Sequence, residues 1–269
     1  MNMRLDAIKI ISVGLVFFHV YTCIFGIFEP LIQRPIHLIL IMVIVLLSRP
    51  LTGRVGKICD IFFLLFGIIP IAYLIIFYKQ ITDRAGDILN FEIFLGVVLI
   101  ISIAESSRRV IGPILTIIAA VGLIYNIWGD LLPIAGITFR HIAFSRVIYT
   151  QYLSTEGIFT KPLAVSATYV VPFLLFAQIL DASGIKNFLM KVALRGFGKK
   201  RGGPAKVAVV SSALFGMISG SAVANVASTG IVTIPLMKKV GFKPEIAGAI
   251  EATASTGGQL APPIMGAVA

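Results

Sequence analysis

Long apolar runs separated by short charged loops constrain this chain more than any other feature. A helix needs about 20 consecutive apolar residues to cross the hydrocarbon core of a bilayer. Because backbone N–H and C=O groups find no partners in lipid, such runs form helices, which satisfy their own hydrogen bonds. The runs that could span are Ile8–Phe28, Leu31–Leu47, Ile58–Tyr78, Ile88–Ala104, Val110–Trp128 and Pro162–Leu180. The sequence therefore predicts an all-α, polytopic helical membrane protein with about six spanning helices.

The composition agrees with a membrane protein and argues against other classes. Hydrophobic residues make up 58% of the 269 residues, and charged residues only 13%. The formal net charge of +11 could suggest nucleic-acid binding, but the basic residues lie in short loops between apolar runs, where membrane topology explains them. The two cysteines, Cys23 and Cys59, provide neither a disulfide framework nor a CxxC metal site. We therefore expect a lipid bilayer, and no nucleic acid, as a partner.

The distribution of basic residues between the loops predicts the orientation. Every second loop is rich in lysine and arginine, whereas the loops between them carry acids that balance their basic residues. The basic groups are Arg4 with Lys9, Arg49 with Arg54 and Lys57, Arg108 with Arg109, and the seven lysines and arginines from Lys186 to Lys206. Basic loops remain in the cytoplasm. The N-terminus is therefore expected in the cytoplasm.

Two segments are not expected to span. The segment from Gly129 to Lys161 has mixed polarity and is predicted to be partly helical and to lie on the external surface. A second segment has apolar residues at helical spacing opposite basic ones, which predicts an amphipathic helix at the cytoplasmic headgroups. Its apolar residues are Ile185, Phe188, Leu189 and Val192, and its basic residues are Lys186, Lys191 and Arg195. A solvated basic loop held by anionic lipid is the alternative interpretation.

Another apolar segment is interrupted near its middle. The part from Val207 to Ser219 would form about 20 Å of helix, too short for a bilayer core of about 30 Å. The run from Ala222 to Met237 follows, and lysines flank both outer ends of the pair. Both ends thus belong on the cytoplasmic side, so the sequence predicts a re-entrant helical hairpin that turns at Ser219-Gly220-Ser221. Polar backbone at that depth must face protein or a water-filled cavity.

A second break follows in a different form. Pro244 and Glu245 suit a helix start, Ile246–Ser255 carries the chain inward, and the sequence STGGQLAPP interrupts it about 17 Å from that start. Transporters use interrupted helices to hold anions at N–H groups and sodium at carbonyl oxygens. Close packing of small residues is the alternative explanation for either break alone. Two breaks at matching depth favour a binding site.

Ionisable residues within the apolar runs are the remaining candidates. Glu251, on the helix that approaches the second break, could couple to a cation or a proton, because acids inside membranes are usually functional. It could equally be a structural hydrogen-bond partner near the interface. The acids expected at the interface are Asp60, Glu92 and Asp181. The histidines, which are expected to form no ligand pair, are His19, His37 and His141.

The sequence of the C-terminal part, GGPAKVAVVSSALFGMISGSAVANVASTGIVTIPLMKKVGFKPEIAGAIEATASTGGQLAPPIMGAVA, resembles the large membrane subunit of tripartite ATP-independent periplasmic (TRAP) transporters. It is most similar to fused permeases of the TAXI branch. The likeness is specific from Lys161 to Ala269, and extends more loosely to LSTEGIF and GPILTIIAAVGLIYNIWGDLLP. It implies a four-helix region like the small subunit at 1–104, a connecting helix and external segment at 105–160, and the first part of the transport subunit at 161–269.

The resemblance implies an elevator-type importer that is a multi-pass protein of the cytoplasmic membrane of a bacterium or archaeon. Such an importer would use a sodium gradient and receive an organic acid from a periplasmic substrate-binding protein. The tip of the hairpin would be formed by Ser219, Gly220, Ser221 and Asn225, and the interrupted helix by Ser255, Thr256, Gly257, Gly258, Gln259, Pro262 and Pro263. Together they would line one cation site and half of a carboxylate site. Within that set, sodium is assigned to Ser221, Thr256 and Gly257. Sodium is the coupling ion, and no other cofactor is expected.

The chain departs from the family pattern in one respect. Family members contain a second, inverted copy of the hairpin and broken helix, whereas this sequence stops after PPIMGAVA. Since such sites need both halves, the chain is expected to require the remaining half of the permease. A non-transporting membrane scaffold derived from such a permease is the alternative. No HExxH, GxSxG or complete P-loop motif occurs, so an enzyme is not expected.

Overall fold

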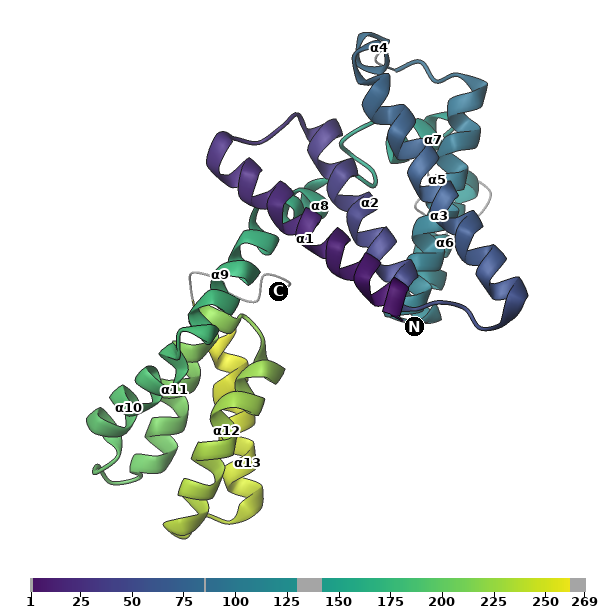
Figure 1. Ribbon diagram of the computed structural model, residues 1–269. Coiled ribbons are helices and arrows are strands. Elements are labelled where there is room, and N and C mark those ends of the chain that lie inside the picture. Colours follow the sequence, from purple (N-terminus) through teal and green to yellow (C-terminus); the bar gives the residue numbers. More distant parts are fainter. Residues whose placement is uncertain (1, 85, 130–141, 262–269) are drawn as a thin grey trace. The chain divides into compact units, whose positions relative to one another are not determined.

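The computed structural model describes residues 2–84, 86–129 and 142–261, and within these ranges every regular element is a helix (Figure 1). The chain divides into two compact units, Met1–Tyr169 and Val170–Ala269. Each unit is described separately below. The prediction of an all-α, polytopic membrane protein is confirmed.

The first unit begins with long apolar helices joined by short loops. Its elements are α1 (Asn2–Phe25), α2 (Pro30–Ser48), α3 (Gly53–Ile76), α4 (Tyr78–Asp83), α5 (Asn90–Val110), α6 (Pro113–Trp128), α7 (Phe144–Tyr152), α8 (Lys161–Val165) and the π-helix η2 (Ser166–Val170). The second unit contains α9 (Val171–Ala182), α10 (Ile185–Phe197), α11 (Gly203–Ser219), α12 (Ala222–Lys239) and α13 (Pro244–Gly258).

Five helical stretches in the described ranges are long and apolar enough to cross a membrane. They are Arg4–Phe25, Pro30–Ser48, Gly53–Ile76, Asn90–Val110 and Lys161–Leu180. The fifth predicted span, Val110–Trp128, is shorter than expected, because the chain turns at Gly112 (φ +101°) and α6 starts only at Pro113. In turn, α5 extends past its predicted end at Ala104 to Val110. Glu105 supports this extra turn by pairing with Arg108 and Arg109.

The core of the first unit forms where α3, α5 and α7 pack together. Its buried residues include Ile71, Leu74, Leu95, Leu99, Tyr152 and Phe159. The hydroxyl of Tyr152 donates to the carbonyl oxygen of Pro70 at 2.7 Å, and burial raises the pKa of this phenol. The helix α7 thus belongs to the core, and the segment between Gly129 and Lys161 is partly helical, as predicted. Its location on the external side of the membrane stays a prediction. Residues 130–141, including His141, lie outside the described part.

Glu92 and Asp60, which were predicted to lie at the membrane interface, each form an ion pair with an arginine. Glu92 is fully buried in the first turn of α5, and its carboxylate accepts from Arg84 at 2.7 Å and from the hydroxyl of Tyr73 at 2.9 Å. Asp60 on α3 accepts from Arg109 at 2.6 Å. The sequence prediction that these acids are interfacial missed partners that come from other elements. The side chain of Asp181 is outside the described set.

The second unit is built around α11, α12 and α13, which lie side by side (Figure 1). Ala208, Met237 and Ala247, one from each helix, are fully buried where the three helices meet. The helix α10 packs against α11 and buries Ala193. These helices position the residues predicted to form the site.

The exposed face of α10 differs from the sequence prediction. Phe188 and Val192 are 63% and 44% exposed, and Lys191 and Arg195 are exposed beside them. Leu189 instead lines a cavity against α11 and α12. The expected separation of apolar and basic faces is therefore wrong, because packing against α11 uses part of the apolar face and leaves the rest among the cations.

Candidate functional site

A two-residue turn joins α11 to α12 and forms the tip of a helical hairpin. Gly220 has φ +59°, a left-handed conformation that costs glycine little, and its N–H donates to the carbonyl oxygen of Gly216. Ser221 then has an extended backbone, and its hydroxyl accepts from the N–H of Ala224 at 3.3 Å, which caps α12. The local sequence Ser219-Gly220-Ser221 is sufficient to end one helix and start the next.

The two arms of the hairpin are antiparallel and joined by buried polar contacts. The amide nitrogen of Asn225 donates to the carbonyl oxygen of Ser212 at 2.8 Å. One turn further from the tip, the hydroxyls of Ser212 and Thr229 lie 3.3 Å apart. The hairpin predicted from the sequence is therefore present. Its entry into the membrane from the cytoplasmic side remains a prediction.

Two glycines let α11 and α13 approach backbone to backbone. A Cβ atom on Gly216 would lie 2.7 Å from Cα of Gly258 and nearer still to its carbonyl. A Cβ atom on Gly258 would lie 2.8 Å from Nδ2 of Asn225 and nearer still to the carbonyl oxygen of Ser212. Only glycine fits at such positions. The crossing brings the C-terminal end of α13 to the hairpin tip, where Gln259 Nε2 donates to the carbonyl oxygen of Gly220 at 3.3 Å.

Glu251 lies at the centre of the three helices in a shell of hydroxyl groups. Its carboxylate is fully buried and accepts hydrogen bonds from the hydroxyls of Thr229 and Thr233 on α12. The hydroxyls of Ser212 on α11 and Ser255 on α13 also donate to it, each at 3.3 Å. Within the described residues, Glu251 has no cationic partner. A carboxylate surrounded by oxygen atoms can hold a small cation or carry a proton.

Some of the predicted site residues are buried between the helices, and others are exposed. Asn225, Ser255 and Gly258 are buried where the helices meet, and Gln259 contacts the hairpin tip. Thr256 and Gly257 are exposed, and the hydroxyl of Thr256 donates to the carbonyl oxygen of Ala252 on its own helix. Pro262 and Pro263 lie outside the described residues.

The position of the second break is corrected by the structure. The helix α13 continues through Ser255, Thr256 and Gly257 to Gly258, so the break starts about three residues later than the sequence predicted. Packing of Gly258 against α11 keeps this glycine pair helical despite its low helix propensity. Likewise α11 begins at Gly203, and its 17 residues correspond to about 26 Å, still less than the bilayer core.

The first unit contains a buried polar chain that the sequence did not indicate. His19 Nε2 and His37 Nδ1 lie 2.8 Å apart, and His37 Nε2 lies 2.9 Å from the hydroxyl of Ser166 in the π-helix. Gln33 also donates to the carbonyl oxygen of Ala167 in that helix at 3.1 Å. The expectation was that the histidines form no ligand pair; the hydrogen bond between His19 and His37 does not test it, but the sequence did not predict this contact. No sequence spacing could have found them, since they pair only when α1 packs on α2.

The fold and the site together define a class of protein. Apolar helices of spanning length, a hairpin with a polar tip and a buried acid among hydroxyls are features of multi-pass membrane transporters. The sequence profile of the DctM component of tripartite ATP-independent periplasmic transporters matches residues 97–269, which is more than half of the chain. The chain therefore belongs to this family of TRAP large permeases, whose members are transporters and operate with a periplasmic binding protein.

Individual relatives match a shorter stretch. The Uncharacterized protein y4mL of Sinorhizobium fredii is 42% identical over 94 residues, which cover 35% of this chain and 22% of that protein. The C4-dicarboxylate TRAP transporter large permease protein DctM of Vibrio cholerae is 33% identical over 94 residues, 35% of this chain and 21% of that protein. The Isethionate TRAP transporter permease protein DctMQ of Oleidesulfovibrio alaskensis is 34% identical over 94 residues, 35% of this chain and 15% of that protein.

The matched stretch thus spans about a fifth of the length of these relatives. No solved structure matches the chain.

Proposed function

We propose that this chain is the membrane permease component of a sodium-coupled importer of organic acids in the cytoplasmic membrane, with its N-terminus in the cytoplasm. A periplasmic binding protein delivers the substrate, and the remaining half of the permease completes the site. Membership of the TRAP large permease family supports transport as the activity. The names of two relatives, which refer to C4-dicarboxylates and isethionate, support an organic anion as the substrate class.

The observation that carries the proposal is the buried carboxylate of Glu251, which lies among hydroxyls and has no cationic partner within the described residues. A buried carboxylate is costly to keep ionised unless a charge of opposite sign accompanies it. A sodium ion in the oxygen-rich region between α11, α12 and α13 would provide that charge. In this proposal, binding of a cation near Glu251 is coupled to binding of ligands at the hairpin tip. The helix α13 connects the two places, because it runs from Glu251 to the tip.

At the tip, the proposed cation ligands are the hydroxyl of Ser221 and the oxygens of Thr256 and Gly257, as the resemblance implies. Ser221 lies in the turn, and Gln259 holds the end of α13 against Gly220. The N-terminal end of α12 offers backbone N–H groups to the carboxylate of a substrate. The hairpin tip would therefore hold the anion, and the oxygen atoms beside it the cation.

Uptake of labelled C4-dicarboxylate by cells that express the permease and its binding protein tests this function. We expect sodium-dependent uptake, and we expect Glu251→Gln to reduce it by about tenfold or more, since the neutral amide keeps hydrogen bonds but loses the charge. Glu245→Gln, an exposed acid on the first turn of the same helix, is the matched control and should leave uptake unchanged. Uptake that is insensitive to sodium would reject the proposed coupling.

The same assay tests the tip. Ser221→Ala and Gly257→Ala are expected to weaken the sodium dependence strongly, whereas Ser183→Ala, an exposed serine between α9 and α10, should not. An unaltered sodium requirement in both tip variants would reject these ligands without rejecting transport. A chain that assembles in the membrane with its other half but supports no uptake would instead favour the scaffold alternative.

A further inference from the structure

An open groove of about 690 Å³ follows the outer face of α10. Three cationic side chains line it: Lys191 and Arg195, which are four residues apart on the same face of α10, and Lys199, which lies in the turn after the helix. Phe188, Val192 and Leu194 form its apolar part. The groove therefore combines three positive charges with an aromatic and an aliphatic surface.

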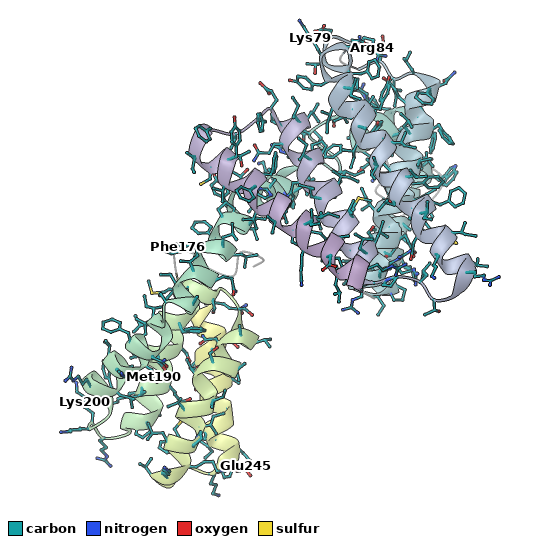
Figure 2. All side chains as sticks on the ribbon, in the orientation of Figure 1. Lys79, Arg84, Phe176, Met190, Lys200 and Glu245 are labelled. Atoms are coloured by element: carbon teal, nitrogen blue, oxygen red, sulfur yellow. The ribbon has the colours of Figure 1, made fainter. Side chains whose placement is uncertain are left out.

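Within the second unit, the described residues leave this face of α10 uncovered. The opposite side of the helix buries Ala193, and Leu189 and Met190 line a separate cavity of about 290 Å³ with residues of α11 and α12. In Figure 2, Met190 lies on α10 and Lys200 in the connection that follows it. The internal contacts of α10 are thus made by one side, while the cations and Phe188 remain on the other.

No acid of the same region neutralises the groove. The sequence contains no aspartate or glutamate between Asp181 and Glu245. The ion pairs seen in the described residues all lie in the first unit and include none of the three cations. The ammonium nitrogen of Lys200 lies over the ring of Phe197, 5.2 Å from its centroid. Lys200 thus adds a further positive charge next to the groove. The groove therefore presents an unbalanced positive charge to an anion.

We propose that this groove binds the headgroup of an anionic phospholipid such as phosphatidylglycerol. Arg195 can hold phosphate oxygens with two parallel N–H bonds, and the two lysines add charge at each side. Phe188 and Val192 contact the glycerol and the first carbons of the acyl chains, where aromatic side chains are favourable. The mixture of apolar and cationic groups on one face fits a lipid better than it fits a free anion. This inference needs only a membrane location, and does not rest on the proposed transport activity.

Native mass spectrometry of the purified full chain, titrated in detergent with phosphatidylglycerol or with phosphatidylcholine, tests the proposal. We expect tighter binding of phosphatidylglycerol. The triple variant Lys191→Gln/Arg195→Gln/Lys199→Gln should raise its apparent Kd by about tenfold or more, since each basic residue near a membrane surface contributes severalfold to binding. The conservative variant Lys191→Arg/Lys199→Arg should retain binding, and thermal unfolding confirms that each variant is folded.

The triple variant Lys238→Gln/Lys239→Gln/Lys243→Gln is the matched control. It removes the same number of charges from the same unit, at the connection between α12 and α13. If this control weakens phosphatidylglycerol binding as much as the α10 variant does, general electrostatic attraction explains the effect and the groove is not a site. If millimolar inorganic phosphate displaces the lipid, the site binds a free anion and the lipid assignment fails. Equal binding of phosphatidylcholine also overturns the proposal.

Discussion

At the scale of single residues, the site depends on two glycines, whose lack of a side chain lets two helices pack closely. Gly216 and Gly258 allow the backbones of α11 and α13 to touch, and this contact places the end of α13 beside the hairpin tip. A Cβ atom on their neighbour Gly257 would instead meet no atom of the described residues of another helix within 4 Å. Two adjacent glycines of α13 therefore have different roles, because only one of them faces another helix.

Gly258→Ala tests this difference. The added methyl group would overlap the carbonyl oxygen of Ser212 and Nδ2 of Asn225, and overpacking of this kind costs about 1–3 kcal/mol or more. We expect a clearly lower midpoint of thermal unfolding in detergent. Gly257→Ala is the matched control, and should keep the midpoint or raise it slightly, since alanine favours a helix over glycine. Equal midpoints for the two variants would show that the helices do not cross this closely.

At the scale of elements, charged side chains join the ends of three helices in the first unit. The guanidinium of Arg109, at the end of α5, donates to Asp60 on α3, to Glu105 on α5 and to the carbonyl oxygen of Arg49 after α2. The Arg109 side chain is 3% exposed, whereas that of its neighbour Arg108 is 47% exposed and pairs with Glu105. Because Arg109 is buried and Arg108 is exposed, we expect the two arginines to contribute unequally to the stability of the chain.

Arg109→Ala leaves Asp60 without its cationic partner. Breaking a buried ion pair by removing one partner costs about 3 kcal/mol, so we expect a large decrease in the unfolding midpoint of the chain in detergent. Arg108→Ala should change the midpoint little, since exposed pairs contribute little to stability. The two variants remove the same charge from the same helix end. A similar decrease in both would mean that net charge, and not the buried pair, determines the stability.

At the scale of the whole molecule, the basic loops and the hairpin together predict the topology. Lys206 lies in the first turn of α11 and Lys239 ends α12, so the antiparallel arms place both at the same end of the hairpin. The positive-inside rule puts that end in the cytoplasm. By the same rule the end of α6 near Asn126 should face the periplasm, because Arg108 and Arg109 precede that helix.

Labelling with a membrane-impermeant maleimide checks this topology. In a chain with Cys23 and Cys59 replaced by serine, Lys206→Cys and Lys239→Cys should react only in inside-out vesicles. Asn126→Cys should react in intact cells. Reaction of positions 206 and 239 from opposite sides would mean that α11 and α12 together cross the membrane, and the re-entrant hairpin would be wrong.

The sequence was sufficient for features that depend on neighbouring residues or on the bilayer alone. Apolar runs of spanning length predict helices because a bilayer has a fixed thickness and offers no hydrogen bonds. The turn at Gly220 follows from a glycine that can adopt φ +59° between two serines, one of which caps α12. For the same reason the hairpin was correctly predicted, and Glu251 was selected because it is an acid on the apolar helix that approaches the second break.

The tertiary structure alone decided which distant residues meet. The hydroxyl shell of Glu251 brings together three helices, the pair of His19 and His37 needs α1 against α2, and α13 reaches Gly258 because α11 supports it. The exposed face of α10 likewise depends on which side α11 covers. None of these contacts has a characteristic spacing along the chain, since each is fixed by packing between helices whose mutual rotation the local sequence does not determine.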